Sequence, residues 1–96
     1  MTSKAATLAI SIADAVSAVP GVQRLTGGDG VEVATQYAGG KVVGVRLDKT
    51  VQIHLVANQM PLPAVAADAA KAARSVLAAA GDDRQVEVFV DDIEGV

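Results

Sequence analysis

A glycine-rich segment, VPGVQRLTGGDG at residues 19–30, raises the question of phosphate binding. A phosphate loop presents backbone N–H groups at the start of a helix, usually with a lysine or a following Ser or Thr. Here TGGDG leads into the alternating pattern of a strand, and no lysine lies nearby. A GxxG loop of the KH type, from Gly27 to Gly30, would need two flanking helices and a basic groove, and the neighbouring sequence has neither. Because glycine readily adopts positive φ angles, we interpret the segment as a turn.

His54 is the only histidine, and the chain has no cysteine that could join it in a site. Its strand parity is opposite to that of Val51, Ile53 and Leu55, which predicts a histidine at the surface or beneath a partner. A lone surface histidine explains this position better than a catalytic base does. No serine stands in a nucleophile elbow or a recognisable triad. The sequence therefore predicts no catalytic residue and no enzyme activity.

Carboxylates gather near the C-terminus, where Asp91 and Asp92 look like a pair. Neighbours on a strand point to opposite faces, however, so these two do not converge. Glu87 and Asp91 share a face with Phe89 between them, and they would suit a cation only if other ligands came from elsewhere. We interpret them as a solvated acidic edge that discourages strand addition. No metal, cofactor or nucleotide site is predicted.

The composition describes one small domain, residues 1–96, with no room for a second core. Hydrophobic residues make up 51% of the chain but aromatic ones only 2%, so its apolar content is mainly alanine and valine. The absence of cysteine excludes disulfides and thiolate sites, which fits a reducing compartment.

The charge distribution disfavours nucleic acid as a partner. Residues 1–81 carry seven basic and five acidic side chains, whereas residues 82–96 carry six acidic side chains against Arg84 alone. A weakly charged body with an acidic end is a poor match for a polyanion. Direct membrane insertion is not predicted either, because no uncharged apolar run approaches the roughly 20 residues that span a bilayer. The N-terminal AATLAISIA resembles a signal peptide, but Asp14 interrupts it, and we interpret it as an amphipathic helix.

Two helices are predicted from apolar residues at helical spacing. The first begins at Thr2 or Ser3 and ends at Pro20-Gly21. Its expected core face is Ala5, Leu8, Ile12, Ala15, Val16 and Val19, and its far side is Ala6, Ile10, Ala13 and Ser17. The second lies in MPLPAVAADAAKAARSVLAAAG, with Pro63 in its first turn and Gly81 as its C-terminal cap. Its expected core face is Val65, Ala69, Ala72, Val76 and Ala80, while Asp68, Lys71, Arg74 and Ser75 face away.

Strands are predicted where apolar and polar residues alternate, at residues 31–37, 42–47, 51–57 and 86–92, with a possible short strand at 22–25. The first three form an antiparallel meander, and the second helix is a crossover that makes the strands at 51–57 and 86–92 parallel. The fold class is therefore α+β: one mixed sheet of three to four strands with both helices on one face, in the order α-β-β-β-α-β. The residues expected to be buried are Val16, Val19, Val45, Ile53, Leu55, Val65, Val76 and Val88.

Taken in order, these elements resemble the alkaline shock protein family, the envelope stress response proteins of Gram-positive bacteria. The likeness runs from IADAVSAVPGVQRLTGG through GVEVATQYAGGKVVGVRL and VQIHLVANQMPLPAVAADAAKAARSVL to VEVFVDDI, over roughly residues 8–93. Members of that family often carry an aromatic-glycine pair before the second helix, where this chain has Asn58-Gln59-Met60.

The resemblance implies a non-enzymatic protein of the cytoplasm that self-associates and takes part in envelope homeostasis. It also implies a position peripheral to the membrane, through a separate membrane-anchoring protein. It supplies no catalytic, cofactor or metal residues.

Protein–protein contact, in part with a second copy of the chain, is the predicted mode of action. A core made mainly of alanine and valine buries little apolar area for a chain of 96 residues. Ile10 and Phe89, in contrast, face outward according to the helical and strand periodicity. Ile10 beside Ala6 and Ala13 would form a low-relief surface on which another helix could pack, and Phe89 would be an aromatic anchor. The alternative is a small-molecule or RNA-binding module, which the glycine turn and the basic residues Lys71 and Arg74 permit.

Overall fold

The protein is described by a computed structural model that covers residues 3–28 and 32–96. Helix α1 spans Lys4–Ser17, and the Ser3 side chain caps it by accepting a hydrogen bond from the Ala6 N–H at 3.1 Å. Helix α2 spans Leu62–Ala79, with Pro63 in its first turn. Gly81 follows α2 with a positive φ of 73° and donates its N–H to the Ala78 carbonyl, as expected of a C-terminal cap.

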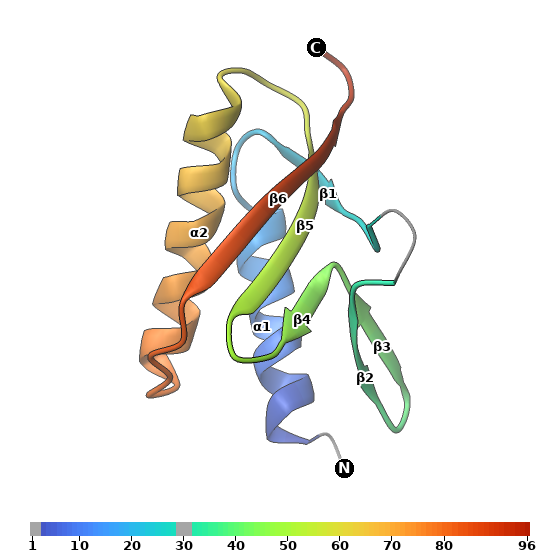
Figure 1. Ribbon diagram of the computed structural model, residues 1–96, viewed down its shortest axis with the longest axis vertical. Helices are drawn as coiled ribbons and strands as arrows, with labels where there is room; N and C mark the ends of the chain where they lie inside the picture. The colour runs from blue at the N-terminus through green and yellow to red at the C-terminus, as the bar shows by residue number, and fades with distance from the viewer. Residues whose placement is uncertain (1–2, 29–31) are drawn as a thin grey trace.

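The strands form two sheets, and Figure 1 shows their arrangement along the chain. The main sheet consists of β1 (Val22–Leu25), β4 (Val45–Leu47), β5 (Val51–Ala57) and β6 (Val86–Ile93). The second sheet is a hairpin of β2 (Ala34–Tyr37) and β3 (Gly40–Val43).

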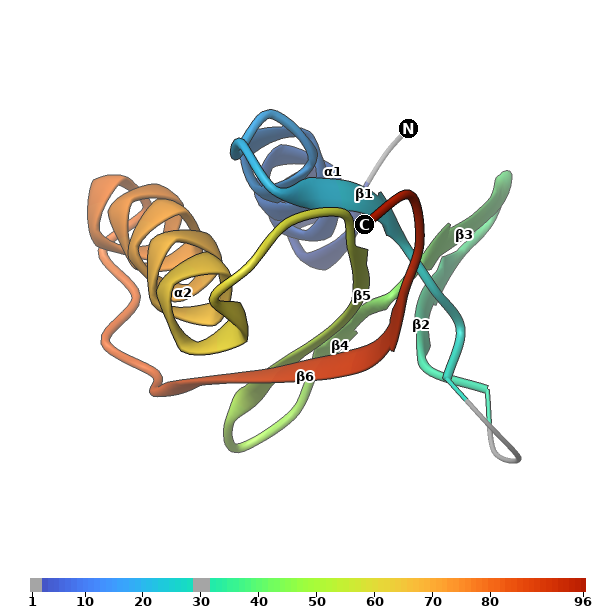
Figure 2. The same ribbon diagram turned by 90° about the horizontal axis from the view of Figure 1, so that it is seen from above.

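Strand β5 is the centre of the main sheet. Its one edge is shared by β4, which pairs antiparallel with residues 51–53, and by β1, which pairs antiparallel with residues 55–57. Its other edge pairs with β6, and this pairing is parallel because α2 carries the chain back across the sheet. Both helices cover the same face of this sheet, as the view from above shows (Figure 2). The predicted α+β fold, its mixed sheet and its helical layer are therefore confirmed.

Gly44 divides the predicted strand 42–47 into two. Its φ is +88°, its N–H donates to the Val33 carbonyl, and its carbonyl accepts from the His54 N–H, both at 2.9 Å. The chain thus leaves the hairpin and enters the main sheet at this residue, so the three predicted strands do not make one meander. The face of the strand also changes, because Val42 is buried while Val43 is 38% exposed. Strict alternation over residues 42–47 would place Val43 on the same face as the buried Val45, and the exposure of Val43 contradicts this.

The core lies between the helices and the inner face of the main sheet. Five of the predicted core residues are buried, namely Val16, Val45, Ile53, Leu55 and Val65. The other three, Val19, Val76 and Val88, are only half-buried against this core, so their predicted burial was wrong.

The buried face of α2 differs from the prediction in its C-terminal half. Its buried residues follow steps of four, at Val65, Ala69, Ala73 and Leu77. Ala80, which the predicted stripe included, is exposed. The long side chain of Leu77 is 1% exposed and sets the orientation of this end of the helix.

Candidate functional site

The predicted contact surface on α1 is only partly available. Ile10 is 37% exposed, as expected. Ala6 is fully buried, and Ala13 is half-buried against the core. A low-relief surface of Ala6, Ile10 and Ala13 was therefore a wrong prediction.

The reason lies in the small side chains of α1. The helix buries Ala6, Ala9, Ile12 and Val16, a face turned away from the one expected around Leu8. Because alanine allows a helix to approach its neighbours closely, the close packing of small side chains determines which face of α1 is buried, and the size of Leu8 does not. Leu8 is left half-buried at the margin of the core.

Phe89 lies in a small cluster on the face of the main sheet opposite the helices. Val86, Val88 and Val90 pack against the core, so the alternate residues of β6 point to the other face. The parallel register places Phe89 beside His54, and their rings stack with centroids 4.5 Å apart and 18° between their planes.

Asp91 completes this cluster from the same strand. Its Oδ2 lies 2.8 Å from Nδ1 of His54, and the two side chains are 22% and 17% exposed. The imidazole is thereby held between a carboxylate and an aromatic ring. Strand parity predicted that His54 lies on this face. No local pattern identified its two partners, because their contact depends on the register between strands 51–57 and 86–92.

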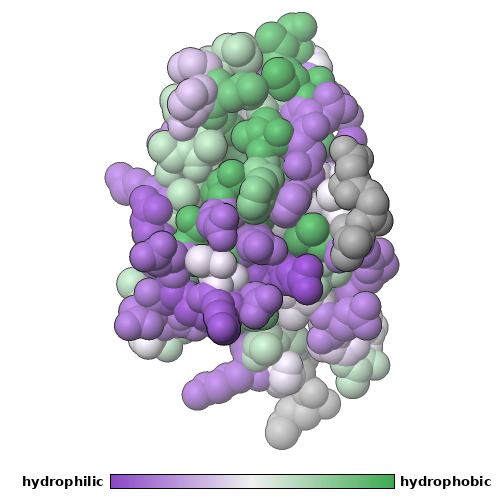
Figure 3. All heavy atoms as spheres, in the orientation of Figure 1, coloured by the Kyte–Doolittle hydropathy of each residue, from purple (hydrophilic) through white to green (hydrophobic). Residues whose placement is uncertain are grey.

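Apolar side chains are exposed along β6 and the residues that follow it. Phe89 is 38% exposed, Ile93 40% and Val96 75%, and we call these three residues the C-terminal apolar patch. Figure 3 shows apolar atoms gathered over the upper half of this face, where β6 runs toward the C-terminus, and polar atoms over the lower half. Outside this patch, the exposed large apolar residues of the described chain are Ile10 on α1, Val43 on β3 and Met60 before α2.

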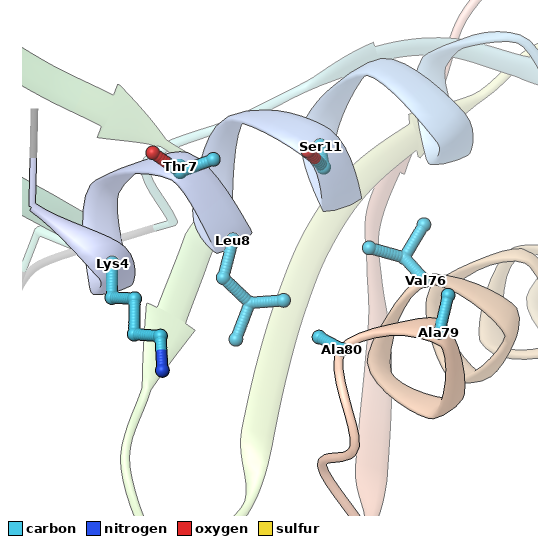
Figure 4. A pocket seen from close by; sticks show the side chains of 7 residues that line it. All are labelled: Lys4, Thr7, Leu8, Ser11, Val76, Ala79 and Ala80. Carbon is cyan, nitrogen blue, oxygen red and sulfur yellow. The ribbon is translucent and has the colours of Figure 1, made fainter.

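A groove of about 500 Å³ lies between the N-terminal half of α1 and the C-terminal end of α2. It is lined by Lys4, Thr7, Leu8, Ser11, Val76, Ala79 and Ala80. Figure 4 shows Leu8 reaching from α1 into the space before Val76 and Ala80, with the Lys4 side chain at one end. The predicted core faces assigned Leu8 and Val76 to the interior, and this is why the groove was missed.

Arg84 joins two turns of the chain next to this groove. Its guanidinium donates to both carboxylate oxygens of Asp82, at 2.6–3.1 Å, and to the carbonyl of Asp48 at 3.1 Å. The hydrogen bonds from the Arg84 side chain, and then from its backbone N–H, hold the pKa of the Asp82 carboxyl below its ordinary value. The same pairing raises the pKa of Arg84.

The glycine segment turns the chain at its first glycine. Gly21 has a φ of +95°, and a Cβ there would lie 2.8 Å from side-chain atoms of Gln59 and Val65. Its carbonyl accepts from the Asn58 N–H, and the Asn58 side chain donates to Gln23 at 2.8 Å. The loop before α2 is therefore fixed against this turn. Residues 29 and 30, at the far end of the segment, and residue 31 after it lie outside the described part of the chain.

The remaining polar candidates stay at the surface. Glu87, Lys71 and Arg74 are exposed, and Asp92 accepts a hydrogen bond from the Ile93 N–H. Among residues 3–28 and 32–96, no three His, Cys, Asp or Glu side chains lie close enough together to hold a metal ion. Within the same residues, neither helix has the length and hydropathy needed to cross a membrane.

Comparisons with known protein families, with curated proteins and with solved structures find no match for this chain. The likeness to the alkaline shock proteins therefore remains a resemblance based on the sequence segments quoted above.

Proposed function

We propose that this domain is non-enzymatic and acts through protein–protein contacts, including contacts between copies of the chain. The observation that carries the proposal is the C-terminal apolar patch, and within it the exposed aromatic ring of Phe89. The Phe89 ring is fixed on one side by His54, so little side-chain freedom is lost when a partner covers its exposed side. Rigid aromatic residues of this kind are typical anchors of protein interfaces.

The arrangement around His54 supports the non-enzymatic part of this proposal. The imidazole lies against Phe89 and Asp91 on a sheet face, away from the groove between the helices. A catalytic base needs a reacting group within hydrogen-bond reach in a site that can enclose a substrate. The contacts of His54 instead hold Phe89 and Asp91 in place on this face of the sheet.

The resemblance to the alkaline shock proteins supports the biological setting of the proposal. We place the domain in envelope homeostasis, in the cytoplasm and peripheral to the membrane through a membrane-anchoring protein. Cross-linking in cells followed by identification of the captured proteins tests this setting. Recovery of a membrane-spanning protein that depends on Phe89 is the expected result, and cross-linking that is unchanged by Phe89→Glu would contradict it.

Sedimentation velocity tests self-association directly. We expect the wild type to form a species larger than the monomer as its concentration rises, and Phe89→Glu to shift this equilibrium toward the monomer. Ile10→Lys is the matched variant, because Ile10 has nearly the same exposure on a different element. A wild type that stays monomeric at all concentrations would end the self-association proposal.

The groove between α1 and α2 favours a second candidate, the binding of a small apolar molecule. Its apolar wall and the Lys4 amine at one end would suit a short alkyl chain with an acidic head. A thermal shift with octanoate tests this candidate. A rise in Tm that Leu8→Lys removes and Ile10→Lys preserves would support it, and equal shifts for all three proteins would exclude it.

A further inference from the structure

Strand β6 lies at the edge of the main sheet with one side free. Within the described residues, its only strand partner is β5. Figure 1 shows β5 to the right of β6 and helix α2, not a strand, to its left. An unpaired edge of this length presents a row of backbone donors and acceptors that another strand can bind.

The hydrogen bonds to β5 determine which residues face this free side. The Gln85 carbonyl accepts the Val51 N–H at 2.8 Å, so the backbone groups of Gln85 point toward β5. These groups alternate along a strand, so those of Glu87 and Phe89 also point to β5. Three residues between and beside them present their N–H and carbonyl groups to the free side, namely Val86, Val88 and Val90.

The side chains of the same three valines are incompletely covered. Val86, Val88 and Val90 pack against the core but are only half-buried, because the sheet ends at this strand. A further strand with apolar residues at matching positions would extend the inner layer and cover them.

The segment VEVFV, residues 86–90, is complementary to itself about its centre. In an antiparallel pairing centred on Val88, Val88 lies opposite its own copy and Val86 lies opposite Val90 of the second copy. These are the residues whose backbone groups face the free side in both strands. This register therefore keeps the hydrogen-bond parity and pairs all three valines.

The charges of β6 also fit this register. It places Glu87 opposite Phe89 of the second copy, and Asp91 opposite Gln85. If the pairing were centred on Glu87, the Glu87 side chains of the two copies would lie directly opposite each other. If it were centred on Phe89, Glu87 would lie opposite Asp91 of the second copy. Both alternatives are unfavourable, because like charges directly opposite are destabilising. The acidic residues that were interpreted as a barrier to strand addition thus select a register rather than exclude pairing.

We infer that β6 is a self-association edge, on which a second copy adds its own β6 antiparallel and centred on Val88. This inference rests on the self-association proposed above and names its site. A twofold axis through that centre, perpendicular to the sheet, extends the four-stranded sheet into the second copy. The helices of both copies then lie on the same face.

Cysteine cross-linking tests the register without background, because the chain contains no cysteine. Glu87 and Phe89 of the second copy would form a pair without mutual backbone hydrogen bonds, with Cα atoms about 4.5 Å apart, within disulfide range. An oxidised mixture of Glu87→Cys and Phe89→Cys proteins should give the mixed dimer, whereas Glu87→Cys alone should give little. Gln52→Cys, on the same face but on the interior strand β5, is the control that should stay uncross-linked.

Charge exchange is an independent test with exposed residues. Phe89→Glu would oppose a glutamate to Glu87 in both halves of the dimer and weaken the dimer about tenfold. Adding Glu87→Lys to this variant should restore association, and circular dichroism should show that each variant is folded.

The outcomes separate this inference from the proposed function. A mixed disulfide together with charge rescue supports pairing at β6. A dimer that forms in sedimentation but shows neither result overturns the inference and leaves self-association standing on another surface. A wild type that is monomeric at all concentrations overturns both.

Discussion

The aromatic ring of Phe89 and the imidazole of His54 stack with their centroids 4.5 Å apart, although the two residues come from strands separated by an entire helix. Their contact depends on the parallel pairing of β5 with β6. It joins the last strand to the centre of the sheet by side chains as well as by backbone hydrogen bonds.

We therefore predict an energetic coupling between His54 and Phe89. Each single substitution by alanine should destabilise the protein, and the double variant should lose less than the sum of the two. Aromatic pairs of this geometry couple by about 0.5–1.5 kcal/mol, and the partial exposure of Phe89 favours the lower end. Urea unfolding of the four proteins in the cycle measures the coupling, and additivity within about 0.3 kcal/mol would contradict it.

Gly44→Ala is predicted to destabilise the fold strongly. The φ of +88° is unfavourable for any side chain, and a Cβ would lie 2.7 Å from the Leu25 Cβ and 3.1 Å from the His54 carbonyl oxygen. We expect a loss of at least about 2 kcal/mol in the free energy of unfolding. Gly39→Ala is the matched control, because its added Cβ would meet only the Tyr37 ring, at 3.5 Å. Equal losses for the two variants in urea unfolding would refute this role of Gly44.

Gly44 also shows where the sequence stops predicting the fold. Apolar and polar residues alternate, so the strands, their order and the two helices could be found. The alternation continues through residues 42–47, however, so it does not predict the residue at which the chain passes from the hairpin to the main sheet. Only the positive φ at Gly44, where an added Cβ would collide with Leu25, separates β3 from β4.

The sequence likewise predicted only part of the candidate site. Parity alone placed Ile10, His54 and Phe89 at the surface, because each of them differs in phase from the core residues around it. It could not predict that Ala6 would be buried, since alanine is compatible with both sides of a helix. The stacking of Phe89 on His54 depends on a register between distant strands, which no local pattern determines.

Leu77→Ala is predicted to be among the costly substitutions in α2. Leu77 is 1% exposed and belongs to the buried cluster, so its truncation leaves a cavity and should cost about 2–5 kcal/mol. Val76→Ala, one position earlier, removes a half-buried side chain at the margin of the groove and should cost clearly less. Urea unfolding of the two variants compares them, and a larger loss for Val76→Ala would mean that α2 presents the face expected from sequence alone.

The ion pair of Asp82 with Arg84 gives a prediction about pH. The hydrogen bonds from Arg84 lower the pKa of the folded Asp82 carboxyl below 3.8, its ordinary value, which the unfolded chain retains. Asp82 therefore contributes stability that is fully present above pH 3.8 and is lost as the pH falls through the lowered pKa. Asp82→Asn should lower the Tm at pH 7, and the two proteins should converge below that range.

Asp83→Asn controls for the loss of one negative charge in the same turn, because Asp83 is the exposed neighbour of Asp82. Thermal unfolding followed by circular dichroism between pH 2 and pH 7 compares the three proteins. Arg84→Lys keeps the positive charge but cannot donate two parallel hydrogen bonds to the carboxylate, so it should lower the Tm at pH 7 in the same direction as Asp82→Asn. If the Tm of Asp82→Asn followed that of Asp83→Asn at every pH, the hydrogen bonds from Arg84 to Asp82 would have no measurable effect on stability.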